Sequence, residues 1–83
     1  MWVIKMSKPE LTFSQQIIYD CIVKYIKETD SLPSMRTIMR MAGLNTVSTV
    51  YVHLQHLKEK GYITYTPGKN KSIRPVEMLE RID

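Results

Sequence analysis

Residues 34–61 read SMRTIMRMAGLNTVSTVYVHLQHLKEKG, and this stretch begins with the signals of a short helix and a turn. Ser34 can cap the helix, because its hydroxyl accepts a hydrogen bond from an unpaired backbone N–H of the first turn. Gly43 can supply the turn, since it reaches positive φ without a Cβ penalty. The apolar residues recur on one helical face; they are Met35, Ile38, Met39 and Ala42.

A second, longer helix is expected over residues 47–60. Thr46 can cap it, and Gly61 lies where a glycine commonly ends a helix. Its inner face repeats at helical spacing and comprises Val47, Val50, Leu54 and Leu57. Two helices joined by a tight glycine turn are typical of the helix-turn-helix, whose second helix fits the DNA major groove. The same pattern also occurs in helical hairpins that bind no nucleic acid.

Another helix is expected before this pair. Thr12 and Gln15 form a T-x-x-Q capping box, and the helix should extend to about Thr29. One face carries an apolar stripe, within which Cys21 is interpreted as a small core residue. The stripe comprises Ile17, Ile18, Cys21, Ile22, Tyr25 and Ile26.

After Gly61 the pattern becomes extended. Residues 62–66 are β-formers, Pro67 and Gly68 signal a turn, and a second extended run ends at Pro75, interpreted as a stop. This predicts a β-hairpin with a basic tip at residues 67–71. The expected fold is therefore mainly α with a small β-hairpin, a three-helix winged helix-turn-helix over residues 11–75.

The two ends flank this domain. Residues 1–10 are expected to form an arm or short strand, and residues 76–83 a short tail with one or two helical turns. Trp2 either packs over the domain or makes a dimer contact. The candidate dimer contacts are the apolar residues of both ends, which are Trp2, Val3, Ile4, Val76, Leu79 and Ile82.

Charge is distributed unevenly along the 83 residues, whose net charge is +4. Residues 34–75 hold seven basic side chains against Glu59 alone, whereas residues 1–33 are balanced. A concentrated positive charge is expected of a surface that faces phosphates, although it also fits a solvated basic face. The basic residues are Arg36, Arg40, Lys58, Lys60, Lys69, Lys71 and Arg74.

Composition excludes several classes of protein. A single cysteine permits neither an internal disulfide nor a cysteine zinc cluster, and two histidines three residues apart do not make a metal site. No signal peptide or membrane span is visible, so a cytoplasmic location is expected. No nucleophile–base pair or phosphate loop is visible either, so neither enzymatic activity nor a cofactor is expected.

The outer side of the 47–60 helix offers groups that can read bases. It is centred on Ser48, Val52, Gln55 and Glu59, with Thr49 and His56 on one edge and Tyr51 on the other. Hydroxyls can bond base edges, glutamine can bond adenine, and Val52 can meet a thymine methyl, unless it borders the core. The candidates for backbone contact are Ser34, Arg36, Arg40, His56, Lys58, Lys69, Lys71 and Arg74.

From Leu11 to Pro75 the chain resembles the N-terminal DNA-binding domain of LexA, the SOS-response repressor. The resemblance rests on LTFSQQIIYDCIVKYI, LPSMRTIMRMAGL, STVYVHLQHLKEKGYI and the closing SIRP. It implies a winged helix that reads an operator through its third helix, usually as a dimer. By position it assigns base reading to Thr46, Ser48, Thr49, Tyr51 and Val52. Tyr51 and Val52 depart from the acidic or small residues common there, which leaves the operator sequence open.

The resemblance also implies a partner and a setting. The family's Ser-Lys self-cleaving domain, which would follow residue 83, is expected to be absent. The chain is therefore expected to act as a stand-alone regulator from a phage or other mobile element. We expect a sequence-specific regulator of double-stranded DNA, a repressor, forming a homodimer at least on DNA. The alternative is a winged helix that binds a protein, such as a host repressor or RNA polymerase.

Overall fold

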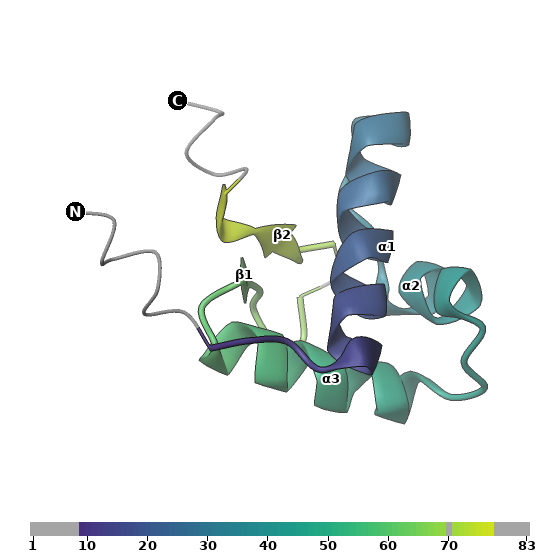
Figure 1. The fold of residues 1–83 in the computed structure, drawn as a ribbon. Coiled ribbons are helices and arrows are strands. Elements are labelled where there is room, and N and C mark those ends of the chain that lie inside the picture. The colour runs from purple at the N-terminus through teal and green to yellow at the C-terminus, as the bar shows by residue number, and fades with distance from the viewer. Residues whose placement is uncertain (1–8, 70, 78–83) are drawn as a thin grey trace.

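The computed structural model describes residues 9–69 and 71–77. Three helices are followed by a two-stranded antiparallel hairpin, the winged helix-turn-helix expected from the sequence. The helices are α1 (Phe13–Thr29), α2 (Met35–Ala42) and α3 (Val47–Glu59). Figure 1 shows α1 standing across α3, with α2 on one side of α1 and the hairpin on the other. The sequence predicted a strand or arm over residues 1–10 and a tail over 76–83, of which residues 1–8 and 78–83 lie outside the described part.

Each helix starts at the cap that the sequence predicted. The Thr12 side chain accepts from the Gln15 N–H, and the Gln15 side chain accepts from the Thr12 N–H, which completes the capping box of α1. Ser34 and Thr46 cap α2 and α3 by accepting an N–H bond from the residue three positions later. These bonds satisfy backbone donors that have no partner inside the helix.

Two glycines end the helices of the helix-turn-helix. Gly43 has φ 73° and donates to the Arg40 carbonyl, while the Leu44 N–H bonds to Met39. Gly61 has φ 86°, and its N–H and that of Tyr62 repeat the pattern at the end of α3. The paired bonds are those of the Schellman motif, in which a left-handed residue lets the last carbonyls find donors. The turn prediction for Gly43 and Gly61 is confirmed.

The hairpin has shorter strands than the sequence pattern suggested. β1 (Ile63–Thr64) pairs with β2 (Arg74–Pro75) in the register Ile63↔Pro75 and Thr64↔Arg74. The strand ends at Pro75, as the sequence predicted, and Pro75 is itself the buried last residue of β2. A proline is tolerated there because both strands are edge strands, so its missing N–H costs no ladder bond.

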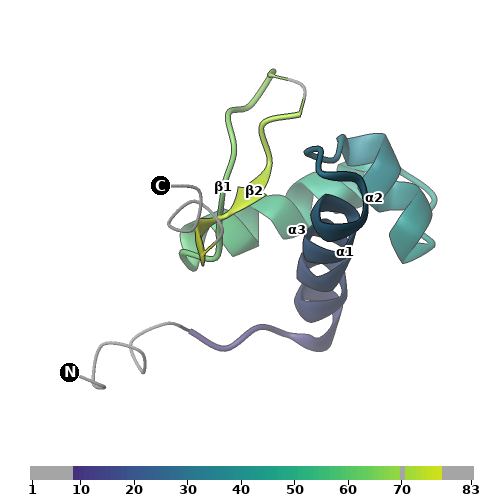
Figure 2. The ribbon, with the colours of Figure 1, turned by 90° about the horizontal axis from the view of Figure 1, so that it is seen from above.

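Beyond these pairs a side chain holds the hairpin together. The Ser72 hydroxyl accepts from the Thr66 N–H at 2.9 Å and lies within hydrogen-bond distance of the Thr66 and Lys69 carbonyls. We call residues 63–75 the wing. Figure 2 shows the wing extending beyond α3 on the side where α2 begins.

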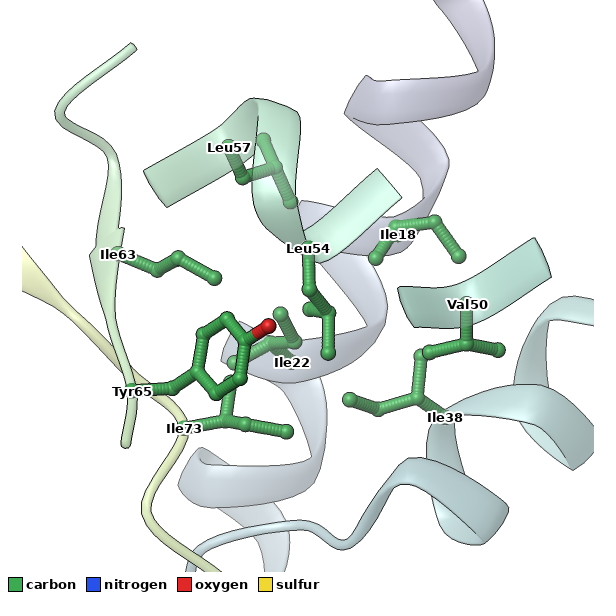
Figure 3. Packing of buried hydrophobic residues seen from close by; sticks show 9 residues of the cluster. All are labelled: Ile18, Ile22, Ile38, Val50, Leu54, Leu57, Ile63, Tyr65 and Ile73. Carbon is green, nitrogen blue, oxygen red and sulfur yellow. The ribbon is translucent and has the colours of Figure 1, made fainter. Parts of the chain in front are cut away.

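The core lies where all these elements meet (Figure 3). Its side chains come from the three helices and from the wing, and they are Ile18, Ile22, Ile38, Val50, Leu54, Leu57, Ile63, Tyr65 and Ile73. Only Ile18 and Ile22 of the stripe predicted for α1 belong to this set, while Ile26 packs against it and Tyr25 is half-buried. Ile17 is 38% exposed and Cys21 is only half-buried. Leu11 and Tyr19 pack against the core in place of Ile17 and Cys21. The reason is that α3 and the hairpin contact the side of α1 on which Leu11 and Tyr19 lie.

Candidate nucleic-acid interface

The outward face of α3, which we define as Ser48, Thr49, Val52 and Glu59, points away from the core. All four side chains are exposed, and Val52 keeps half of its surface accessible. The possibility that Val52 borders the core is therefore wrong: the core is reached through Val50, Leu54 and Leu57, on the opposite side of the helix. The sequence placed an apolar side chain on this face, and the structure leaves it uncovered.

The wing flanks the outward face along one edge. The Tyr65 ring contacts the Tyr51 ring edge to face, with centroids 6.5 Å apart, and Lys58 Nζ lies 5.2 Å from the Tyr65 centroid. The Tyr65 hydroxyl donates to Gln55 Oε1 at 3.0 Å. Burial, followed by the neighbouring Tyr51 hydroxyl, raises the pKa of Tyr65, which keeps its phenol protonated and able to donate.

This contact gives Gln55 a role that its position in the sequence did not reveal. Gln55 was predicted at the centre of the outer side, yet it is half-buried and its amide oxygen accepts the Tyr65 bond. Its Nε2 group remains as a donor, whereas bidentate pairing with adenine needs the oxygen as well. Tyr65 is the residue that sequence reasoning missed, because it appeared only as one β-former among several.

The first helical turns of the helix-turn-helix carry two similar caps. Thr46 Oγ1 lies 3.1 Å from Thr49 Oγ1, and Ser34 Oγ lies 3.0 Å from Thr37 Oγ1. Both threonines stand three positions after the cap residue. Thr46 and Thr49 are exposed, so their hydroxyls support the start of α3 while remaining accessible at the end nearest the bases in a helix-turn-helix.

A basic hollow separates the wing from the start of α2. Its volume is about 490 Å³, and its lining comprises Ser34, Met35, Arg36, Val47, Tyr65, Thr66, Gly68, Lys69, Lys71 and Ile73. Arg36 comes from α2, whereas Lys69 and Lys71 come from the wing tip, which lies more than 30 residues later in the chain. The fold thus gathers cations that are distant in sequence.

A second hollow lies beside the wing and adds two more cations. Its lining includes Lys58 and Arg74 together with Lys69 and Lys71. Of the eight residues predicted to contact the backbone, six therefore line these two hollows; they are Ser34, Arg36, Lys58, Lys69, Lys71 and Arg74. Arg40 is exposed one turn after Arg36 on α2.

The remaining candidate, His56, lies on the opposite edge of the outward face. It is exposed, and its Nδ1 lies 3.2 Å from Gln15 Nε2 of α1. Lys60, the one basic residue of 34–75 that was not predicted to contact the backbone, points to α1 as well and donates to Gln15 Oε1 at 2.6 Å. The wing and the start of α1 thus border the outward face on its two sides.

Within residues 9–69 and 71–77, no group of three or more metal-binding side chains is found, and no helix has the length and apolar character needed to cross a membrane. Cys21 is a free thiol whose pKa is raised, first by burial and then by Asp20, so the reactive thiolate is disfavoured.

Comparison with known proteins bears on the same residues. A family model described as the LexA DNA binding domain matches residues 8–72. The chain is 43% identical over 75 residues to the LexA repressor of Staphylococcus epidermidis, covering 89% of this chain and 36% of that protein. The LexA repressor of Caldicellulosiruptor saccharolyticus is 41% identical over 70 residues, covering 84% and 35% respectively. The transcription regulator LexA of a Synechocystis strain is 38% identical over 64 residues, covering 77% and 32%. The chain thus spans about a third of the length of these relatives.

Proposed function

The chain belongs to the LexA DNA-binding domain family, and from that premise we propose that it is a transcriptional repressor that binds double-stranded DNA by sequence. The observation that carries the proposal is the arrangement around α3. The exposed outward face of α3 lies between the wing on one side and the start of α1 on the other. The basic side chains are carried by the wing, by its edge of α3 and by α2. This arrangement suits a helix lying in the major groove with phosphates on either side.

Within this function we assign two different roles. Ser48, Thr49 and Val52, with Thr46 and Tyr51 at the edges, read base edges. The backbone is held by Ser34 and the neighbouring basic residues, which are Arg36, Arg40, Lys58, Lys69, Lys71 and Arg74. The Nε2 group of Gln55 can donate one hydrogen bond to an acceptor on a base.

Substitutions should separate these roles. Ser48→Ala and Val52→Ala should relax sequence preference at one base pair each, by about 1–3 kcal/mol if the contacts are well formed. Lys69→Ala and Lys71→Ala should weaken all sequences about equally and lower the salt dependence of binding by about one counterion each. The measurement is selection of bound fragments from random DNA for each variant, followed by affinity titrations. The assignment of base reading to α3 and of backbone contact to the wing would be contradicted if the wing variants changed the preferred sequence and the α3 variants did not.

We further propose that the protein binds its operator as a homodimer. One such domain contacts few base pairs, and strong specific binding usually comes from two copies on half-sites about one helical turn apart. The candidate contacts from the sequence are Trp2, Val3, Ile4, Val76, Leu79 and Ile82. Of these, only Val76 lies in the described residues, where it is half-buried and its N–H bonds to the Tyr62 carbonyl.

Truncation tests this assembly. A chain that begins at Ser7 should fill two half-sites with less cooperativity than the full chain, because Trp2 is the residue type that most often anchors an interface. The measurement is sedimentation of both proteins alone and with a palindromic duplex. Unchanged cooperativity after truncation would show that the N-terminal residues make no dimer contact. Val76, Leu79 and Ile82 would then be the remaining candidates.

A second candidate function is binding of a protein partner such as RNA polymerase or a host repressor, and one observation favours it. Phe13, the first residue of α1, is 82% exposed, and the partly exposed Ile17 follows one turn later. The two side chains are four residues apart and share one side of α1, and neighbouring exposed apolar side chains can belong to a contact surface. Sedimentation with purified polymerase in place of DNA, for wild type and Phe13→Ser, distinguishes this function from repression.

A further inference from the structure

Gln15 is the one polar side chain that is buried among the residues the structure describes, with 6% of its surface exposed. It lies in the first turn of α1, where its role as half of the capping box was predicted from the sequence. Its amide nevertheless also reaches across to α3. Such a buried amide must satisfy both its oxygen and its nitrogen, so the identity of each neighbour matters.

The orientation of this amide is determined by its neighbours. Oε1 lies 3.1 Å from the Thr12 backbone N and 2.6 Å from Lys60 Nζ. Lys60 is held in place by a second bond, 2.9 Å to the Glu10 carbonyl. A backbone N–H and an ammonium group can only donate. Turning the amide around would therefore point its NH₂ group at two donors, which is unfavourable.

The amide orientation in turn determines the state of His56. Gln15 Nε2 lies 3.2 Å from His56 Nδ1, and an amide NH₂ group has no lone pair to offer. The hydrogen bond therefore requires Nδ1 to be the acceptor, without a proton. The neutral imidazole must then carry its hydrogen on Nε2, because the partner of one ring nitrogen sets the role of the other.

We propose that Gln15 is a positioning residue that fixes this tautomer, so that His56 presents an uncharged Nε2–H donor to a DNA phosphate oxygen. His56 is exposed and follows Val52 by four residues and Thr49 by seven, which places it along the same side of α3. The inference rests on the DNA-binding function proposed above and adds to it a backbone contact that is not cationic. Uncharged donors contribute many phosphate contacts of this type.

The first test needs no DNA. The ¹⁵N chemical shifts of the His56 ring in the full chain, measured at one fixed pH above neutrality, should show an unprotonated Nδ1 and a protonated Nε2. In Gln15→Leu the same ring should relax to a mixture of tautomers. A wild-type ring that carries its proton on Nδ1 overturns the proposal, and this result does not depend on how well the variant folds.

The second test uses a labelled operator duplex. His56→Ala should lower affinity about five- to tenfold, the effect of one hydrogen bond, without changing the slope of log affinity against log salt, because an uncharged donor releases no counterion. His56→Gln, which restores an uncharged donor, should recover part of the affinity. Lys69→Ala is the matched control, since it should lower the slope by about one.

Gln15→Leu should reproduce the loss seen in His56→Ala, and the double variant should be no weaker than either alone, because both act through one contact. A slope reduced by His56→Ala as much as by Lys69→Ala overturns the proposal, since His56 would then act as a cation. Unchanged affinity in Gln15→Leu overturns it too. Absence of duplex binding by the wild type would instead refute the DNA-binding function, while the ring chemical shifts would still report the tautomer.

Discussion

Raising the salt concentration from 50 to 200 mM should lower the affinity for duplex DNA about a thousandfold, the effect expected for six phosphate contacts. Each contact releases condensed counterions from the DNA, and added salt opposes that release. Five cations line the two basic hollows, whose linings contain no acidic side chain, and Arg40 is a sixth, exposed on α2; the five are Arg36, Lys58, Lys69, Lys71 and Arg74. Fluorescence anisotropy with a labelled operator duplex, repeated across salt concentrations, measures the slope.

The same chain provides matched controls for this measurement. Lys24 and Lys27 of α1 line a different hollow, together with Asp20, Glu28 and Glu77. Lys24→Ala and Lys27→Ala remove the same charge as Lys69→Ala but should leave the salt slope unchanged. If affinity stayed flat across the salt range, or if these α1 variants lowered the slope as much as the wing variants, the proposed interface would be refuted.

Leu54→Ala should destabilise the folded domain by about 2–5 kcal/mol. Leu54 is fully buried and lies among side chains of α1, α2 and the wing (Figure 3). Shortening it removes apolar contacts and leaves a cavity that the surrounding side chains fill only in part. A domain of this size has a total stability of about 5 kcal/mol, so the variant should be largely unfolded at growth temperature. Urea denaturation followed by circular dichroism gives the free energy of unfolding.

Val52→Ala is the matched control for this stability measurement. Val52 lies in the same helix, two residues before Leu54, but half of its surface is exposed. Its substitution should change the free energy of unfolding by no more than about 0.5 kcal/mol. Equal denaturation midpoints for the two variants would mean that α3 does not bury the face on which Leu54 lies.

Local signals explain which features could be predicted from the sequence. Thr12, Ser34 and Thr46 cap helices through contacts three residues away, and Gly43 and Gly61 end helices through their own backbone preference. Such interactions are encoded in a few adjacent residues. The spacing of Val50, Leu54 and Leu57 likewise identified the buried side of α3, and with it the exposed Val52. The fourth residue predicted for that side, Val47, is 38% exposed, because it lies at the first position of the helix.

Contacts between distant segments could not be predicted in this way. Gln15 meets His56 and Lys60 more than 40 residues later, and nothing in the α1 sequence distinguishes this amide from an ordinary capping partner. The bond between Tyr65 and Gln55 depends on how the wing folds back on α3. Ile17 looked like a core residue because it belongs to an apolar stripe, and only the packing of the other elements determines which part of a wide stripe is covered.

The short strands of the wing have a consequence for how this domain can change over time. Two residue pairs and the Ser72 hydroxyl define the hairpin, and its buried side chains are Ile63, Tyr65, Ile73 and Pro75. Residues 66–69 and 71 are exposed and therefore contribute to the surface rather than to the core. Each doubling of such a loop adds only about 0.6 kcal/mol of closure entropy. Insertions and deletions there should be tolerated, so the number and reach of the wing cations can diversify between lineages while the three helices stay the same.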